Sequence, residues 1–138
     1  MGRQHRSILA LCMRDYRKLE VTGHARALTI AVYAATGRFP AQERYGLAAQ
    51  MRRAAVSVMS NIAEGSARGG EREFLQFLYI ALGSATELAI QVDLAVALSL
   101  ISDADGASLA DQINHVQRML NRFTASVRQK LNRPSANS

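Results

Sequence analysis

Few residues in this chain have the types and spacing that catalysis or metal binding requires. A metal centre inside a helical bundle needs paired Glu-x-x-His motifs that point inward, and the chain contains none. His115 follows Asp111 by one helical turn, which allows a local pair, whereas His5 and His24 lie far away in the sequence. Two groups do not make a site. The sequence therefore predicts no metal and no cofactor.

The serine hydroxyls lack the neighbours that activate a nucleophile. No histidine lies close in sequence to Ser57, Ser60 or Ser84, and no Gly-x-Ser-x-Gly turn occurs. The loop GSARGG at residues 65–70 is rich in glycine but lacks the Lys-Ser/Thr ending of a phosphate-cradling loop. We therefore expect a protein that binds a partner and is not an enzyme.

Several polar residues interrupt the apolar segments. Asn61 and Glu64 lie near the end of a predicted helix, where the helix dipole disfavours an anion. A cation should compensate Glu64, with Arg68 nearest and Arg53 about three turns earlier. Glu87 is expected to pair with an arginine of the preceding helix. We interpret these groups as ion pairs that fix helix register, in preference to ligand contacts.

Arginine rows give the strongest functional indication. Arg52 and Arg53 are adjacent, so they point about 100° apart on a helix, and one can serve the bundle while the other faces outward. Arg118 and Arg122 are four residues apart and share one face. Such rows suit phosphate contacts, which need no exact sequence geometry. The alternative is an ordinary solvated helix face.

Charge is sorted unevenly along the 138 residues, which carry a formal net charge of +6 and a pI of about 10.2. Residues 73–111 hold six acids and no base, whereas residues 112–138 hold five bases and no acid. Residues 1–72 hold twelve bases and five acids. This balance favours an anionic partner, with nucleic acid ahead of a membrane surface. Because aromatic residues do not alternate with the bases, base stacking is not expected.

The sequence also limits the compartment. The single cysteine, Cys12, cannot form an internal disulfide, which fits a reducing environment, and we expect a cytoplasmic protein. The apolar run 8–13 is too short for the core of a signal peptide. Glu87 and Asp93 interrupt the apolar run 74–101 near its middle, so it predicts a buried helix and no membrane span.

Apolar residues recur at steps of three and four in four segments, which predicts four amphipathic helices. We expect them over about residues 21–36, 40–65, 71–101 and 107–131, with Pro40 in a first turn, Gly37 and Gly65 as stops, and good capping residues in the turn 102–106. The stripe positions are Val21, Ala25, Leu28, Val32, Ala35; Leu47, Met51, Ala54, Val58, Ile62; Phe74, Leu78, Ala81, Ala85, Leu88, Val92, Ala95, Leu98; and Leu109, Ile113, Val116, Leu120, Phe123, Val127.

Short connections between the helices predict antiparallel neighbours and hence an all-α, up-down-up-down four-helix bundle over residues 20–131. Residues 1–19 are interpreted as a basic, flexible extension and residues 132–138 as a polar tail. The third helix has further apolar residues beside its stripe, which predicts burial on more than one side, with a neighbouring subunit on one of them. These flanking residues are Phe77, Leu82, Leu94 and Ala97.

Four strings in the chain match a known family pattern: FPAQERYGL, QMRRA, NIAEG and FLYIALGSATEL. Over roughly residues 14–130 the chain resembles the four-helix-bundle family of bacterial 23S ribosomal RNA intervening-sequence proteins. It is also similar to the accessory variability determinant proteins of diversity-generating retroelements. The chain departs from the pattern at Thr22-Gly23, where a tryptophan is usual, and at Met59, where proline is frequent.

The resemblance implies a homopentamer with a basic surface and, in the retroelement branch, binding to a reverse transcriptase and to nucleic acid. Residues that match the family motifs are Arg52, Arg53, Asn61, Glu64 and Glu87.

From the residues and the resemblance together, we expect a homo-oligomer that binds structured RNA or DNA. The expected phosphate contacts are Arg52, Arg53, Arg118, Arg122 and the N-terminal bases. The alternative is an interaction scaffold in which the acidic end of the third helix meets the basic fourth helix of the next copy.

Overall fold

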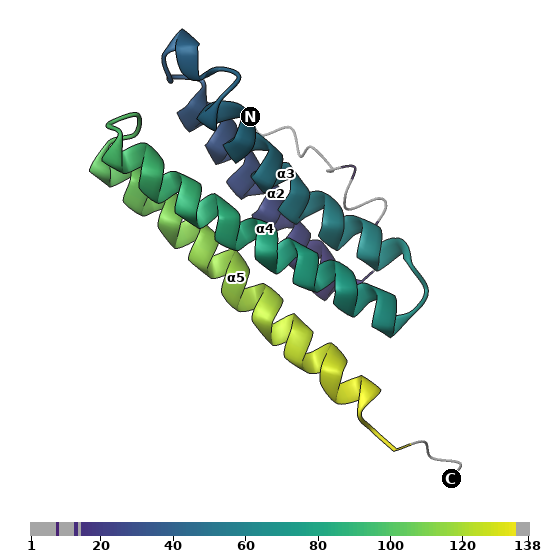
Figure 1. Cartoon of the computed structure of the whole chain (residues 1–138). Helices are drawn as coiled ribbons and strands as arrows, with labels where there is room; N and C mark the ends of the chain where they lie inside the picture. The colour runs from purple at the N-terminus through teal and green to yellow at the C-terminus, as the bar shows by residue number, and fades with distance from the viewer. Residues whose placement is uncertain (1–7, 9–12, 14, 135–138) are drawn as a thin grey trace, which may run out of the picture.

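The computed structural model describes Ile8, Met13 and residues 15–134, and these confirm the all-α class. The long helices are α2 (Tyr16–Thr36), α3 (Leu47–Ala67), α4 (Glu71–Ala97) and α5 (Asp103–Leu131), with a short 3-10 helix, η1 (Ala41–Glu43), before α3 (Figure 1). Most of the predicted extension at residues 1–19 lies outside the described residues, as do residues 135–138 of the predicted tail.

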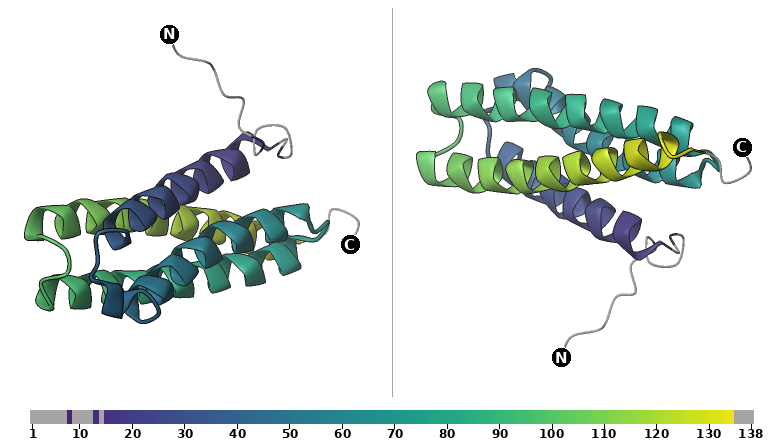
Figure 2. Two further views of the ribbon diagram at one scale, coloured as in Figure 1. Left: turned by 90° about the horizontal axis from the view of Figure 1, so that it is seen from above. Right: turned by 90° about the horizontal axis from the view of Figure 1, so that it is seen from below.

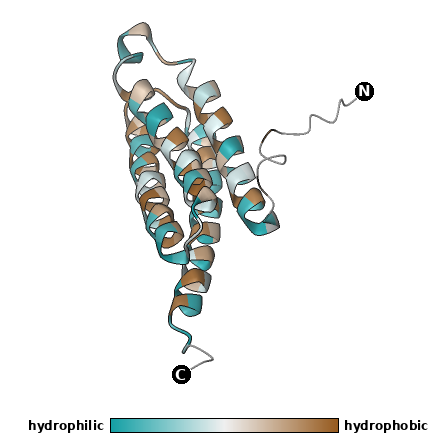
Figure 3. Ribbon diagram, turned by 90° about the vertical axis from the view of Figure 1, so that its right-hand side faces the viewer, coloured by the Kyte–Doolittle hydropathy of each residue, from teal (hydrophilic) through white to brown (hydrophobic). Residues whose placement is uncertain are grey.

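The four long helices pack around one core. α3 lies against α2 and α4, and α5 lies against α4 and α2 (Figure 2). Hydrophobic and hydrophilic residues alternate along the ribbons (Figure 3), and the predicted stripe positions are buried apart from half-buried Leu47 and Leu98, which is 55% exposed. The three-and-four spacing therefore identified the core correctly.

The first helix begins earlier than predicted. α2 starts at Tyr16, inside the segment expected to be a flexible extension, because Asp15 caps it. The Asp15 side chain accepts hydrogen bonds from the backbone N–H groups of Arg17 and Lys18 at 2.9 and 3.5 Å. This cap pairs N–H groups that a helix start otherwise leaves without partners.

The second helix begins later than predicted. Pro40 precedes η1 and does not lie in the first turn of α3, which starts at Leu47. Gly46 has φ −99° and ψ −117°, a conformation that separates η1 from α3. The Glu43 carboxylate then accepts a hydrogen bond from the backbone N–H of Leu47 at 3.3 Å, so Glu43 acts at the start of α3 as a capping group.

Gly65 does not stop α3, which continues to Ala67. Gly65 is buried where α3 meets α4, and a Cβ atom there would lie 2.6 Å from Phe77 Cβ. The glycine therefore permits a close approach of two helices and is not a turn residue.

The third helix ends at Ala97, four residues before the predicted limit, in a Schellman motif. The N–H groups of Ser99 and Leu100 donate to the carbonyls of Val96 and Ala95, both at 2.9 Å. Ser99 has φ 60°, a left-handed conformation that glycine usually supplies.

The fourth helix begins at Asp103 and not near Ala107, because Ser102 caps it. The Ser102 hydroxyl accepts a hydrogen bond from the backbone N–H of Asp105 at 3.1 Å. Asp103 and Asp105 lie in the first turn, where the helix dipole favours negative charge.

Within one chain, the residues that flank the core stripe of α4 are only partly buried, so the expected neighbouring subunit on this side stays a prediction. Phe77 and Leu82 are half-buried, but Leu94 is 46% exposed and Ala97 is exposed. They belong to a helix with apolar residues on two sides, of which only one meets the core. Because its apolar residues lie on two sides, α4 is the one helix in the described part of the chain that is long and apolar enough to cross a membrane. Length and composition are the only criteria here, and a core helix of a soluble bundle also meets them.

Candidate nucleic-acid interface

The structure separates the roles of the adjacent Arg52 and Arg53. Arg52 is half-buried, and its Nε donates a hydrogen bond to Thr36 Oγ1 at 2.8 Å. Its guanidinium carbon also lies 4.6 Å from the centre of the Tyr33 ring. Arg53 is exposed at the rim of a polar pocket between α3 and α4. Arg52 therefore braces α2 against α3, and Arg53 is the member of this pair that faces solvent.

The bases of α5 are exposed to solvent, and Arg128 also lies 5.8 Å from the centre of the Tyr79 ring on α4. Arg118 and Arg122 are exposed one turn apart, and the acid-free part of the chain continues through Arg128 and Lys130 to Arg133. Arg128 and Lys130 occupy the last turn of α5, where positive charge complements the helix dipole.

The first turn of α2 adds two bases to the same end of the molecule. Arg17 and Lys18 lie over the rings of Phe123 and Phe74, with distances of 4.9 and 4.5 Å from the ring centres. The two rings themselves meet edge to face at 5.2 Å. These cation–π contacts place Arg17 and Lys18 on the folded bundle, although we expected these residues to belong to a flexible extension.

We call the two bases at the start of α2, together with the bases from the middle of α5 to residue 133, the basic end. Figure 2 shows the start of α2 (purple) and the end of α5 (yellow) at the same end of the bundle. Arg17 and Arg122 line one depression of about 340 Å³, which also contains Glu20. The basic end comprises Arg17, Lys18, Arg118, Arg122, Arg128, Lys130 and Arg133.

Ion pairs occupy few of these bases. The ion pairs between residues 15 and 134 are Arg38–Asp105 at 3.7 Å, Arg68–Glu64 at 3.0 Å and Lys130–Glu71 at 4.0 Å. All three pairs are solvent-exposed, and such pairs contribute little to stability and remain open to competition by other anions. The basic end thus keeps most of its positive charge available to a partner.

The predicted structural polar groups belong to α3, to α4 and to the connection between these helices. Glu64 is paired with Arg68, as the ion-pair distance above shows. Glu87 does not meet an arginine within the described residues: it accepts a hydrogen bond from Gln91 Nε2 at 3.3 Å, although it lines the same pocket of about 580 Å³ as Arg53. Residues four apart on a helix lie next to each other, so Gln91 reaches Glu87 within α4. This local bond takes the place of the expected arginine from α3.

Asn61 forms part of a hydroxyl network between the same two helices. Its Nδ2 donates to the Ser57 carbonyl at 2.8 Å and to Ser57 Oγ at 3.0 Å. Ser57 Oγ lies 2.8 Å from Ser84 Oγ across the interface. These bonds connect α3 to α4, which is a structural role for three of the residues considered above.

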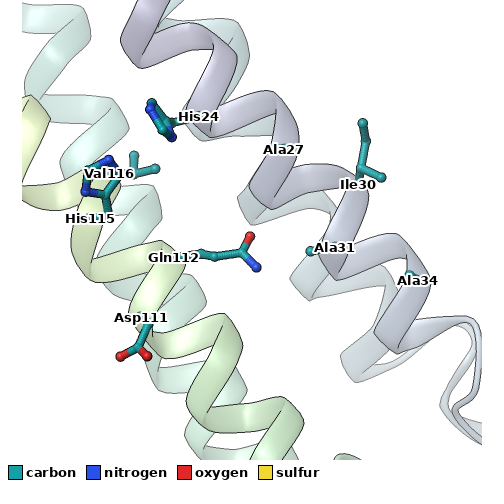
Figure 4. A pocket seen from close by; sticks show the side chains of 9 residues that line it. All are labelled: His24, Ala27, Ile30, Ala31, Ala34, Asp111, Gln112, His115 and Val116. Atoms are coloured by element: carbon teal, nitrogen blue, oxygen red, sulfur yellow. The ribbon is translucent and has the colours of Figure 1, made fainter. Parts of the chain in front are cut away.

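The structure brings together two histidines that the sequence did not connect. The rings of His24 on α2 and His115 on α5 meet edge to face, with centroids 4.6 Å apart. They lie in a groove of about 570 Å³ that we call the α2–α5 groove (Figure 4). Its lining residues are His24, Ala27, Ile30, Ala31, Ala34, Asp111, Gln112, His115 and Val116.

The α2–α5 groove does not have the ligand set of a metal centre. Among the described residues, no three His, Cys, Asp or Glu side chains converge in a way that could hold a metal ion. Two imidazoles and one carboxylate would reach the minimum of three protein ligands only if the side chains converged, and those of His24, His115 and Asp111 do not.

Sequence reasoning missed the two histidines and the cation–π contacts because both join helices far apart in the chain. The only local signal was the four-residue spacing of Asp111 and His115. It indicated one face of α5 but not which residue of α2 would lie opposite.

Fold and surface together define an all-α four-helix protein with one arginine-rich end. The chain belongs to the 23S rRNA-intervening sequence protein family, whose model matches residues 17–122.

A solved structure supports the fold. A protein of unknown function from the S23 ribosomal protein family of Bacteroides thetaiotaomicron VPI-5482 superposes with a TM-score of 0.74 at 16% sequence identity. The match covers 79% of this chain and 98% of that one. No curated protein matches the chain.

Proposed function

We propose that this chain is a non-enzymatic, homo-oligomeric protein of the cytoplasm that binds structured RNA or DNA through its basic end. The observation that carries the proposal is the meeting of two basic segments. The acid-free half of α5 lies beside the first turn of α2, where Arg17 and Lys18 are held by Phe123 and Phe74.

Phosphate recognition is the chemistry that this surface suits. Exposed guanidinium groups release condensed counterions when they contact phosphates, and this drives binding without base-specific geometry. Arg118 and Arg122 supply a row on one helix, while Arg17 extends it across the depression to α2. Arg53 is a secondary contact on another helix, and Arg52 contributes to the fold. Membership of a family described by 23S rRNA-intervening sequences favours RNA.

The proposal is tested by titrating a labelled RNA hairpin at about 50 mM salt. Arg118→Gln combined with Arg122→Gln should weaken binding about 10-fold or more, because the double variant removes two cations that bind phosphates. The matched control is Arg38→Gln combined with Arg44→Gln, which removes the same charge elsewhere and should change affinity little. Equal reductions in affinity in both double variants would contradict the assignment to the basic end.

A second candidate is the interaction scaffold, favoured by the exposed apolar residues of α4. Ile80, Ile90 and Leu94 are 50%, 66% and 46% exposed, which is more apolar surface than a solitary bundle requires. In this alternative the charge sorting serves subunit contacts alone. A protein that assembles but does not bind RNA at low salt would favour it.

We also propose the finer architecture, an up-down-up-down bundle that assembles as a homopentamer. Two ion pairs support the alternating direction. Arg38, two residues after the end of α2, meets Asp105 at the start of α5, and Lys130 near the end of α5 meets Glu71 at the start of α4. The number of copies follows from the resemblance alone and is tested by the mass in solution. A reverse transcriptase partner, also implied by the resemblance, is tested by co-purification with that enzyme.

A further inference from the structure

α4 carries a second heptad-like stripe on the side opposite its core stripe. The positions step by 3, 4, 3, 4 and 3, which is the spacing of a coiled-coil seam. This outer seam of α4 contains one charged residue, Glu87, near its centre. The seam positions are Ile80, Gly83, Glu87, Ile90, Leu94 and Ala97.

The α2–α5 groove has the complementary shape. Its α2 side is lined largely by small residues, Ala27, Ala31 and Ala34, so a neighbouring helix can approach closely. His24 and His115 lie at one end of this alanine row (Figure 4). The groove therefore offers holes for large apolar side chains next to two imidazoles that can donate hydrogen bonds to a carboxylate.

The outer seam and the groove are on different sides of the bundle. Within residues 15–134, α2 and α4 lie diagonally across the bundle: each packs against α3 and α5, and the two meet where Lys18 lies over the Phe74 ring. A subunit with one projecting face and a different receiving face suits heterologous, head-to-tail contacts, which close into rings when the rotation permits.

We propose that the outer seam of α4 in one copy packs into the α2–α5 groove of the next copy, with Glu87 accepting hydrogen bonds from His24 and His115. This inference rests on the homo-oligomer proposed above and names the two surfaces that join its subunits. Ile80, Ile90 and Leu94 provide the apolar contact, and Glu87 fixes the register.

Glu87, His115 and His24 lie at similar heights along the bundle axis, as such a contact requires. Gln117 Nε2 donates to Thr86 Oγ1 at 3.4 Å, which sets Glu87 close to the level of His115. His115 in turn contacts His24. When copies are related by rotation about an axis parallel to the helices, each residue keeps its height along that axis. Glu87 of one copy can therefore meet the histidine pair of the next.

The same register matches the apolar positions. Ile90 lies three residues beyond Glu87, and Ala27 lies three residues beyond His24. Leu94 and Ala31 are each seven residues beyond the same reference positions. With the helices parallel, Ile90 and Leu94 of the outer seam therefore face the small residues Ala27 and Ala31 of the groove.

Charge argues against pairing of α4 with its own copy. Glu87 lies near the middle of the outer seam, so a two-fold antiparallel pair would bring two Glu87 carboxylates together in an apolar contact. Like charges at such a position are destabilising. In the head-to-tail arrangement, Gln91 already donates to one Glu87 oxygen, and the two imidazoles supply donors for the other.

Mixing two complementary variants tests the proposal. Ile90→Arg blocks the seam and Ala27→Arg blocks the groove, and each alone should raise the concentration for half-assembly at least about 100-fold. An equimolar mixture retains one intact seam and one intact groove. It should therefore form a heterodimer of twice the 15.1 kDa chain mass, read by light scattering after gel filtration.

Controls separate folding from assembly. Tyr45→Arg changes a residue that is 88% exposed and outside both surfaces, so this variant should assemble like the wild type. Circular dichroism should show unchanged helicity in all three variants. An Ala27→Arg protein that assembles like the wild type would overturn this contact while the homo-oligomer stands. A monomeric wild type would overturn both, whereas RNA binding is scored separately in the hairpin titration.

A cysteine pair gives a second readout of the register. In a Cys12→Ser background, Glu87→Cys and His115→Cys should form a disulfide between copies under mild oxidation, giving a ladder on a non-reducing gel. Replacing Glu87→Cys by Asp93→Cys, on another side of α4, should abolish the ladder. Equal ladders from both pairs would contradict the proposed register.

Discussion

Arg52 Nε donates a hydrogen bond to Thr36 Oγ1 at 2.8 Å, and this bond joins the start of α3 to the end of α2. Thr36 is 3% exposed, and its hydroxyl donates in turn to the Val32 carbonyl at 2.7 Å. The Arg52 guanidinium also covers the Tyr33 ring. Arg52 is therefore held by two contacts on α2 that Arg53, its neighbour in the sequence, does not share.

Replacing either arginine with glutamine should have different effects. Arg52→Gln should lower the free energy of unfolding by about 1–2 kcal/mol, because it removes a hydrogen bond to a buried hydroxyl and a cation–π contact. Arg53→Gln should change it by less than about 0.5 kcal/mol, since the side chain is exposed. Urea unfolding of the two variants measures this difference, and equal effects would contradict the brace between α2 and α3.

Gly65→Ala should destabilise the protein by about 1–3 kcal/mol, because the added methyl group would overlap Phe77 where α3 meets α4. The matched control is Gly23→Ala within α2, where an added Cβ meets no atom within 4 Å. That change should stabilise by about 0.5–1 kcal/mol through helix propensity. Thermal unfolding midpoints that move in the same direction for both variants would argue against the close approach of α3 and α4.

Ser99→Gly should stabilise the protein by about 0.5–1 kcal/mol, because glycine adopts the left-handed conformation after α4 without the penalty of a Cβ atom. Ser99→Val should be destabilising, since a β-branched residue resists φ 60° most strongly. Chemical unfolding gives both values. A decrease in stability in the glycine variant would show that α4 does not end in a Schellman motif.

The sequence predicted helix existence and core positions better than helix ends. Spacing by three and four residues depends only on helix geometry, so the buried stripes could be identified without tertiary information. Ends depend on single side chains: Asp15 caps α2, Glu43 acts at the start of α3, and Ser99 takes the left-handed position after α4 that glycine usually fills. Gly65 shows the opposite problem, because a glycine can indicate either a stop or a close contact.

The charge of the candidate site could be predicted from the sequence, but not which residues of different helices come together there. Counting acids and bases identified the basic half of α5. Arg17 and Lys18 join that half because they lie over the rings of Phe123 and Phe74. Both phenylalanines are far from Arg17 and Lys18 in the sequence. The meeting of His24 with His115 likewise depends on how α2 lies against α5, which no local pattern encodes.

The salt dependence of RNA affinity is the sharpest test of phosphate binding at the basic end. Affinity of the wild type for an RNA hairpin should fall steeply between about 50 and 200 mM salt, with a log-log slope of several units. Arg118→Gln combined with Arg122→Gln should reduce that slope by about two units, one for each arginine that no longer neutralises a phosphate. A flat salt response in the wild type, or a slope that the double variant leaves unchanged, would contradict phosphate binding by these arginines.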